Sequence, residues 1–314
     1  MVASKKSVGS VASCAQALRH DAQAAVGPCD LRPRTSRTRL VLPGGERVAV
    51  MDDHYSDRIR CDHPETSDGE PLGEALLDLA DDRDRGAVMV IAPNSLGVGI
   101  ERAGVPTVAR IPGLYRGRRD GIIAYRTLAP GRARLANPEA VRRTDRVVHR
   151  RARLSAGGTR GAVRTERARR QDAAGIAALI AETFEDYPTP SGVPEYIERQ
   201  LEQGIPFRVI RHKGRIVSCA SADLVREART AELTDCASHP SQRGRGHMQA
   251  LLRGLMRDLS AMGYPTVFSL ARARVVGMNL ALSRLGFVWR GRTAQSCRLG
   301  KGLEDINVWS CRLK

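Results

Sequence analysis

A glycine-rich turn between a predicted strand and a predicted helix is the feature that most limits how this chain can fold. Residues 239–248 read HPSQRGRGHM, after a strand and before an amphipathic helix. Gly244 and Gly246 allow a tight turn whose backbone N–H groups point inward. The N-terminal dipole of the helix and the charges of Arg243 and Arg245 act in the same sense. The segment therefore predicts a binding site for a pyrophosphate or a similar anion.

The surroundings of this turn exclude two other phosphate-binding motifs and predict an α/β fold. No G-K-[ST] follows the glycines, as a Walker loop requires, and the G-x-G-x-x-G of a Rossmann fold is absent from the turn. Strands and helices alternate on both sides of it. The expected strands are 163–170, 207–211, 215–222, 230–237, 266–271, 291–297 and 306–312, and the expected helices begin at Asp172 or cover 195–203, 248–262 and 276–285.

The stretch before residue 130 predicts a smaller α/β domain. A hairpin is expected from residue 38 on, where RLVL and ERVAVMDD flank a Pro-Gly-Gly turn. Further expected elements are a helix at 72–83, a strand at 87–92, a short helix at 95–103 and strands at 106–111 and 121–128.

A weak internal repeat links the two parts of the chain. Residues 87–105 contain AVMVIAPNS and GIERAGV, and residues 266–287 contain TVFSLARAR and ALSRLGF. Each segment reads as a strand, a helix and a glycine-containing turn. We therefore expect the first domain to be a degenerate half of the same fold as the second domain. The alternative is that two unrelated strand–helix–strand units look alike.

The formal net charge of +17 is concentrated in two segments that do not resemble folded core. Residues 1–40 carry a net charge of +5 and residues 131–170 carry +10. We expect a disordered extension at 1–37, an N-terminal domain at 38–130, an Arg-rich linker at 131–162 and a C-terminal domain at 163–314. Basic segments can bind nucleic acid. No aromatic residue occurs in 131–170, so bases could not stack there, and nucleic acid is the less favoured partner.

The cysteines and the apolar runs favour a cytoplasmic protein without a metal. The seven cysteines lie at 14, 29, 61, 219, 236, 297 and 311, an odd number with no C-x-x-C pair. A disulfide framework and a zinc site are therefore not expected. No apolar run reaches the ~18 residues of a membrane helix. The N-terminal segment has no apolar stretch typical of a signal peptide.

The order of the elements around the turn resembles the core of the GNAT acetyltransferases. The shared features are a strand, P-x-x-R-G-R-G, a helix, a second strand and an Asn-bearing helix that ends in L-G-F. The resemblance implies acetyl-CoA as co-substrate, and Asn279 matches a position that contacts its pantetheine arm. The chain departs from the family at Leu282, where a Tyr often protonates the leaving thiolate, and at Met248, where Gly or Ala is usual. By the resemblance, the CoA pyrophosphate is bound by Arg243, Gly244, Arg245, Gly246, His247 and Met248.

Acyl transfer to an amine requires a base, because a free alkyl ammonium has a pKa of ~10.4. The strand AELTDCA (231–237) carries Glu232 and Asp235, which are expected on opposite faces. The strand resembles that of lysine-acetylating GNAT enzymes, in which the Glu is the base, so Glu232 is the first candidate and Asp235 the second. A structural ion pair or a solvated carboxylate is the alternative. The resemblance also places the oxyanion near the backbone N–H groups of Ala237 and Ser238.

Longer strings are similar to the β-lysine N-acetyltransferases. They are FEDYPTPSGVPEYI (184–197), TAELTDCASHPSQRGRGHM (230–248), SLARARVVGMN (269–279) and GLEDINVW (302–309), together with IPGLYRGRRDGIIAY (111–125) in the first domain. The resemblance implies transfer of acetyl to the ε-amine of β-lysine. The product, Nε-acetyl-β-lysine, serves as a compatible solute, and a lysine 2,3-aminomutase supplies the substrate.

The acceptor implied by this resemblance has two ammonium groups and one carboxylate, so its site should be acidic. Tyr187 or Arg272 would meet the carboxylate. A surface turn is the alternative interpretation of Glu304 and Asp305. The ammonium group that is not acetylated would be bound by some of Glu185, Asp186, Asp235, Glu304 and Asp305.

Two other functions remain open at this point. A GNAT domain can act on another amine, such as a polyamine, an aminoglycoside or a protein lysine, because function resides in the site and not in the fold. Alternatively, the basic segments bind a polyanion and the GNAT domain is not catalytic. Such binding would weaken steeply with salt.

Overall fold

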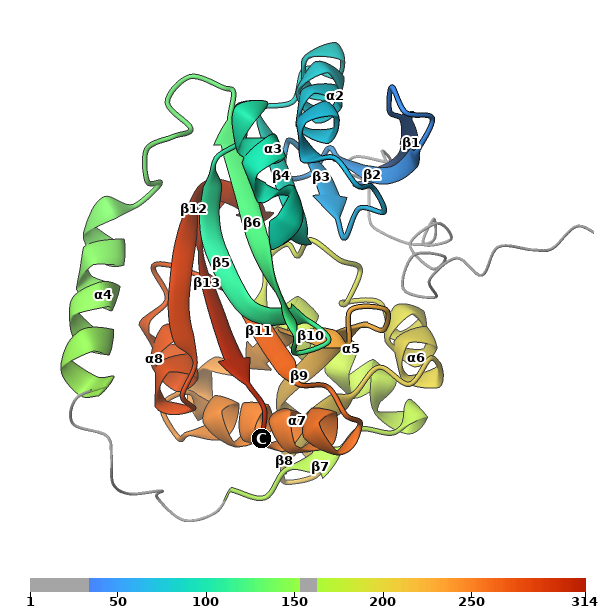
Figure 1. Ribbon diagram of the computed structural model, residues 1–314. Helices are drawn as coiled ribbons and strands as arrows, with labels where there is room; N and C mark the ends of the chain where they lie inside the picture. The colour runs from blue at the N-terminus through green and yellow to red at the C-terminus, as the bar shows by residue number, and fades with distance from the viewer. Residues whose placement is uncertain (1–33, 153–162) are drawn as a thin grey trace, which may run out of the picture.

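The computed structural model describes residues 34–152 and 163–314, which form a continuous 13-stranded sheet covered by helices (Figure 1). The strands follow the order β1-β2-β3-β4-β6-β5-β12-β13-β11-β10-β9-β8-β7. The α/β class predicted from the sequence is confirmed. The expected extension at 1–37 lies outside the described residues except for 34–37, and β1 begins within it at Ser36.

The first part of the chain supplies one half of the sheet. The predicted hairpin is present, and the helix expected from residue 72 begins earlier, at Gly69, because the Asp68 carboxylate caps it by accepting the N–H of Glu70 at 3.1 Å. The elements are β1 (Ser36–Val41), β2 (Arg47–Asp53), β3 (Arg58–Asp62), α2 (Gly69–Asp82), β4 (Ala87–Pro93), α3 (Gly97–Arg102), β5 (Thr107–Tyr115) and β6 (Arg119–Thr127).

The second part of the chain supplies the other half. Its expected strands and helices are all present, although the first expected strand is reduced to two residues. The elements are β7 (Glu166–Arg167), α5 (Ala173–Thr183), α6 (Pro194–Glu202), β8 (Phe207–His212), β9 (Arg215–Val225), β10 (Thr230–Ser238), α7 (His247–Ala261), β11 (Thr266–Arg272), α8 (Val276–Arg284), β12 (Val288–Leu299) and β13 (Gly302–Arg312).

The two halves repeat one topology, in agreement with the internal repeat of the sequence. β3 and β4 are parallel neighbours joined in the chain by α2. β4 pairs antiparallel with β6, and β6 pairs antiparallel with β5. β10 and β11 are likewise parallel on either side of α7, and β11, β13 and β12 pair antiparallel. The halves join where β5 pairs with β12. A Cβ at Gly291 would lie 1.9 Å from the carbonyl oxygen of Val108, so this junction requires glycine.

The two half-sheets also pack against each other through a shared apolar layer, which we call the inter-half core. It joins buried residues of the first half, including Met89, Ile91 and Tyr115, to Phe268 and Val308 of the second. Figure 1 shows β5 and β6 passing in front of β11 and β13, as this packing requires. Side chains on these inner faces of the two halves are therefore brought close together.

Part of the expected Arg-rich linker is a packed helix, α4 (Pro138–Ala152), which contacts α8. Val141 and Val148 are buried on one face of α4, and Asp145 pairs with Arg292 at 2.8 Å. The apolar residues recur one heptad apart, which is why an arginine-rich segment can dock. Residues 153–162 lie outside the described part of the chain, and the proposed domain boundaries stay a prediction.

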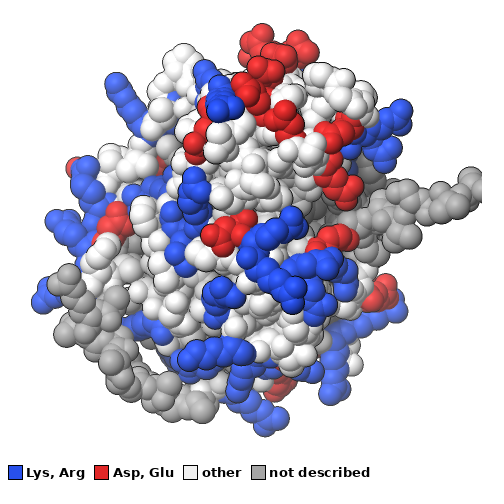
Figure 2. Space-filling model, in the orientation of Figure 1, with Lys and Arg blue, Asp and Glu red and all other residues white. Residues whose placement is uncertain are grey.

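Charge is distributed unevenly over the surface. Figure 2 shows acidic side chains gathered at the top of the view, over α2, and basic side chains spread across the lower part. The anions and cations that approach the molecule are therefore attracted to different regions. The acidic residues of α2 are Glu70, Glu74, Asp78, Asp81 and Asp82.

Candidate active site

The predicted anion-binding turn connects β10 to α7 and has the backbone that its glycines suggested. Gly244 has φ 78° and Gly246 has φ 82°, in the left-handed region that other residues adopt only with strain. Gly246 is also the N-cap of the 15-residue α7. A Cβ at either glycine would meet no atom within 4 Å, so conformation and not crowding requires glycine there. The turn is exposed and lies at a helix N-terminus.

Hydrogen bonds attach this turn to the neighbouring strands. The Ser218 hydroxyl on β9 donates to Ser238 at 3.0 Å and lies 3.1 Å from Nδ1 of His247. Arg243 donates from Nε to the carbonyl of Ser238 at 3.2 Å. Burial and then the charge of Arg245 lower the pKa of His247, which favours the neutral imidazole. The first turn of α7 is thereby held against the end of β10.

The two parallel strands beside the turn separate where the chemistry was expected. β10 pairs with β11 from Thr230 to Glu232, whose partner is Phe268, and this is the last pair described between them. Beyond that point the Ser269 hydroxyl on β11 donates to the carbonyl of Leu233 at 2.9 Å. The pairing of β10 with β9 is irregular between Thr234 and Ala237. Beyond Glu232, β10 therefore borders a split in the sheet, with Ala237 and Ser238 at its far end.

The two candidate carboxylates occupy different environments. Asp235 is buried, has φ 46°, and accepts hydrogen bonds from Ser191 at 3.0 Å and from Ser221 at 2.7 Å. Its carboxylate therefore holds the loop before α6 and strand β9 together. Glu232 is half-buried and lies at the split, where its charge acts on Arg60 of the first half. This difference favours Glu232 as the base and Asp235 as a residue that positions the loop.

Tyr187 lies on that loop and packs against Phe184, with 4.7 Å between the ring centroids. Burial, followed by the charges of Asp235 and Cys236, raises the pKa of Tyr187 well above its ordinary value. The phenol therefore stays protonated and can donate a hydrogen bond at the split. Its neighbour Asp186 accepts a hydrogen bond from Arg34.

Arg272, the last residue of β11, lies close to Glu304 on β13. Arg272 sits over the ring of Phe184 at 5.6 Å and 3.9 Å from the Glu304 carboxylate. Arg274 also pairs with Glu304, from Nε at 2.7 Å. Burial lowers the pKa of Arg272, although the charge of Glu304 opposes this effect. Glu304 is therefore engaged by two arginines, Arg272 and Arg274.

Three expected site residues have other tasks in the structure. Glu185 is exposed and pairs with Lys301 at 3.5 Å, away from the split. Asp305 is buried and is not part of a surface turn, because its carboxylate accepts the backbone N–H groups of Ala136 and Gln295, both at 3.0 Å. These contacts give Glu185 and Asp305 partners within the protein, and their binding of an ammonium group stays a prediction.

Asn279 is the third of these residues. It is buried in α8, and its amide donates to the carbonyls of Arg272 at 2.9 Å and Val275 at 2.8 Å. Its oxygen accepts from Asn307 at 2.8 Å and from the indole of Trp309 at 2.9 Å. These four bonds use the whole capacity of the amide. Asn279 therefore secures the β11–α8 connection to β13. With these four hydrogen bonds in place, its side-chain amide has no donor or acceptor position left for a ligand.

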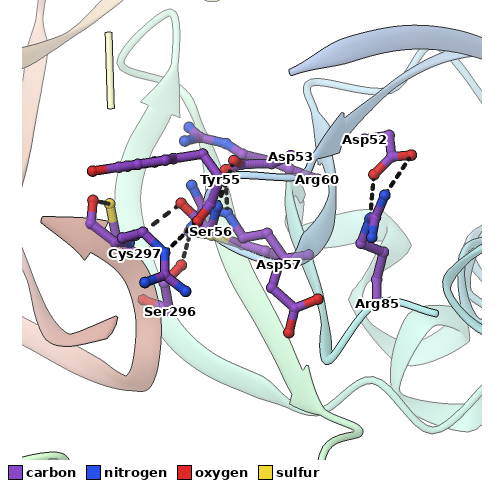
Figure 3. A network of polar contacts seen from close by, with 12 residues as sticks. Asp52, Asp53, Tyr55, Ser56, Asp57, Arg60, Arg85, Ser296 and Cys297 are labelled. Atoms are coloured by element: carbon purple, nitrogen blue, oxygen red, sulfur yellow. Dashed lines mark hydrogen bonds and ion pairs between the residues drawn. The ribbon is translucent and has the colours of Figure 1, made fainter. Parts of the chain in front are cut away.

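The turn between β2 and β3 packs against β12 through residues that the sequence motifs did not single out. Figure 3 shows Tyr55 and Ser56 beside Ser296 and Cys297 of β12. The Tyr55 carbonyl accepts from Nε of Arg298 at 2.7 Å. Burial and then the nearby carboxylate of Asp186 raise the pKa of Tyr55. On the other side of the turn, Asp52 pairs with Arg85.

Sequence reasoning missed these residues because the string at 111–125 indicated only that the first half is similar to the family. That string contains Tyr115, whose hydroxyl lies 2.9 Å from Nδ1 of His63. It gave no sign of which side chains face the second half.

Among residues 34–152 and 163–314, His, Cys, Asp and Glu form no group of three that could hold a metal ion. No helix within the described ranges is long and apolar enough to cross a membrane.

Comparison with known proteins agrees with this geometry. The model of an acetyltransferase (GNAT) domain matches residues 164–276. A β-lysine N(6)-acetyltransferase of Methanosarcina mazei is 41% identical over 142 residues, which cover 45% of this chain and 52% of that protein. The N-acetyltransferase YodP of Bacillus subtilis is 35% identical over 138 residues, or 44% of this chain and 50% of that protein. The match thus spans about half the length of these curated relatives.

A solved structure of a ribosomal-protein-alanine N-acetyltransferase from Brucella melitensis covers 48% of this chain and 99% of its own length, with 18% identity and a TM-score of 0.42. The family model covers the turn, the split and both candidate carboxylates. Residues 164–276 thus match the model of a GNAT acetyltransferase domain, and this part of the chain is similar to about half of a β-lysine N(6)-acetyltransferase.

Proposed function

We propose that this protein is an acetyl-CoA-dependent N-acetyltransferase that acetylates the ε-amine of β-lysine. The observation that carries the proposal is the split between β10 and β11 after Glu232, which leads directly into the turn at Gly244 and Gly246. A carboxylate thus lies where β10 separates from β11, and an anion-binding turn follows the far end of β10. A thioester bound along the split would present its carbonyl between them.

The turn fits the pyrophosphate of CoA. Two left-handed glycines, two residues apart, precede the start of a 15-residue helix at an exposed site, and backbone N–H groups in such a turn are suited to bind an anion. Arg243 and Arg245 add positive charge there. Met248 is half-buried on the first turn of α7, so a residue larger than Gly or Ala is accommodated beside the turn.

Glu232 would accept the proton of the acceptor ammonium group, directly or through water. The neutral amine then attacks the thioester carbonyl, forming a C–N bond, and its nitrogen passes a second proton to water as the tetrahedral intermediate collapses. The C–S bond breaks, and the CoA thiolate takes a proton from water because the usual Tyr position is Leu282, which is buried and carries no acid. N–H groups of Ala237 and Ser238, at the far end of the split, are suited to stabilise the oxyanion.

The substrate assignment rests on the names of the relatives and on the surroundings of the split. Two curated relatives are β-lysine N(6)-acetyltransferases. Phe268, the partner of Glu232, is part of the inter-half core, so the first half of the molecule covers this face of the sheet. Such cover favours a small acceptor over a protein lysine. The product would be Nε-acetyl-β-lysine, a compatible solute, with a lysine 2,3-aminomutase as the source of the substrate.

The direct test is CoA release from acetyl-CoA with β-lysine, α-lysine, a polyamine and a lysine peptide as acceptors. We expect a kcat/KM for β-lysine at least about tenfold above the others, equivalent to ~1.4 kcal/mol of transition-state discrimination. Turnover of another amine alone would retain the acetyltransferase and reject β-lysine. Tight acetyl-CoA binding without turnover of any amine would reject the enzymatic proposal.

A further inference from the structure

The strand registers place Arg60 of the first half opposite Glu232 of the second. Arg60 on β3 is the parallel partner of Met89 on β4, and Glu232 on β10 is the parallel partner of Phe268 on β11. Partners in neighbouring strands share a face of the sheet. Met89 and Phe268 both belong to the inter-half core. The two pairings therefore put Arg60 and Glu232 on the two inner faces that pack together.

The surroundings of Arg60 agree with this placement. Its side chain is 18% exposed, and its Nε lies 2.8 Å from the carboxylate of Asp62. Burial disfavours the charged guanidinium, but the carboxylates of Asp62, Glu232 and Asp53 outweigh this effect and raise its pKa. Among the described residues, the hydrogen bonds and ion pairs of Arg60 engage Nε. Asp62 thus holds the guanidinium through its Nε.

A cation in this position is unexpected for a site that accepts only an amine. A guanidinium as close to the acceptor ammonium as Glu232 is would repel that ammonium about as strongly as the carboxylate attracts it. The conflict disappears if the acceptor carries a carboxylate at its other end. A planar guanidinium binds a carboxylate with two parallel N–H···O bonds.

Arg272, expected earlier to meet this carboxylate, is less suited. It is paired with Glu304 and stacked on Phe184. Tyr187 could still donate one hydrogen bond. Arg60 combines a charge, an Nε held by Asp62 and a position across from the proposed base.

We propose that Arg60, held by Asp62, binds the carboxylate of the amine acceptor, so that the first half of the molecule selects amino acids over simple diamines. This inference rests on the proposed function and extends it by a specificity-determining residue. The charges near the site fit such an acceptor. Arg58 pairs with Asp53 and Arg60 with Asp62, and the charge of Glu232 also acts on Arg60. These five groups have a formal balance of one negative charge, and β-lysine carries one net positive charge.

The test is calorimetric binding of two acceptors to the full chain saturated with CoA, a product complex in which no turnover occurs. The ligands are β-lysine and 1,5-diaminopentane, which has two amines and no carboxylate. In Arg60→Met the Kd for β-lysine should rise about 10- to 100-fold, as expected for the loss of a charge-assisted pair. The Kd for 1,5-diaminopentane should stay within about threefold. Arg60→Lys should lie between, because an ammonium keeps the charge but loses the bidentate geometry.

Arg47→Met is the matched control, since Arg47 is an exposed arginine on neighbouring β2, and it should change neither Kd. Equal weakening of both ligands in Arg60→Met would mean that Arg60 only supports the fold and would overturn the inference. Unchanged β-lysine binding, or a wild-type protein that binds β-lysine no better than the diamine, would overturn it as well. CoA release by the wild-type protein tests the proposed function separately, so the two failures are distinguishable.

Discussion

The hydroxyl of Ser221 on β9 donates a 2.7 Å hydrogen bond to the buried carboxylate of Asp235 on β10. The contact crosses the irregular part of the β9–β10 pairing, where Asp235 has a left-handed backbone. Ser191 occupies the other carboxylate oxygen. The Asp235 side chain thus joins β10, the neighbouring strand β9 and the loop that carries Tyr187.

Ser221→Ala should lower the free energy of unfolding by about 1–3 kcal/mol, because it removes one of two hydroxyl donors from a buried carboxylate. Urea unfolding measures the change. Ser67→Ala, at an exposed hydroxyl, should stay within about 0.5 kcal/mol of wild type. A Ser221→Ala protein as stable as this control would show that Asp235 does not depend on the bond.

Glu232→Gln should lower kcat/KM about 10²- to 10⁴-fold at neutral pH, because the amide cannot take the ammonium proton. Acetyl-CoA affinity should be unchanged. The matched variant is Glu74→Gln, at an exposed carboxylate of α2, and we expect it to retain full activity. Steady-state kinetics and calorimetry distinguish the two effects. A fully active Glu232→Gln enzyme would require another base.

Gly246→Ala should weaken acetyl-CoA binding and also destabilise the fold by about 1–2 kcal/mol, since alanine would have to adopt φ 82°. No neighbour blocks the added methyl group, so the effect is purely conformational. Gly44→Ala offers a comparison, because Gly44 has equally open space without a left-handed backbone. Unaltered CoA affinity in Gly246→Ala, measured by calorimetry, would contradict the role of the turn.

The ion pairs of Asp258 should make stability fall in acid. Burial acts to raise the pKa of Asp258, but hydrogen bonds from Arg208 at 2.7 Å and Arg167 at 2.6 Å outweigh it and lower the pKa. Because the folded pKa lies below the unfolded value, this contribution is complete above about pH 4 and is lost as the pH falls through the folded pKa.

Asp258→Asn should therefore be less stable than wild type near pH 7. Between about pH 5 and pH 3, an interval that spans the unfolded pKa, the variant should lose less stability than wild type. Thermal unfolding across this range measures both slopes. Asp78→Asn, at an exposed position of α2, serves as the reference and should follow the wild-type slope. Parallel slopes for Asp258→Asn and wild type would contradict the assignment.

Asn279→Ala should cost about 2–5 kcal/mol of stability, because four buried hydrogen bonds are lost and two carbonyls and two donors are left behind. Its effect on acetyl-CoA binding should follow from this destabilisation and be small in the folded protein. If the variant were as stable as wild type but bound acetyl-CoA more than about tenfold weaker, Asn279 would contact the ligand directly.

The local features of the site were predictable from sequence because they depend on short segments. Two glycines two residues apart, ahead of an amphipathic helix, predict the left-handed turn at Gly244 and Gly246 whatever surrounds it. The alternation within AELTDCA places Glu232 and Asp235 on a strand. The similarity of 87–105 to 266–287 predicted the repeated topology, since each segment is one strand–helix–strand unit.

What each polar residue does was decided by contacts between segments far apart in the chain. Asp305 meets Ala136, Asn279 meets Trp309, and Asp235 meets Ser191, and none of these partners is near in sequence. Motifs therefore singled out acidic residues but could not distinguish those that bond to neighbouring segments from Glu232 at the split. Arg60 carried no signal, because its place opposite Glu232 arises only when the two half-sheets pack. Local geometry is encoded in neighbouring residues, whereas the partners of a buried charge depend on how the whole sheet closes on itself.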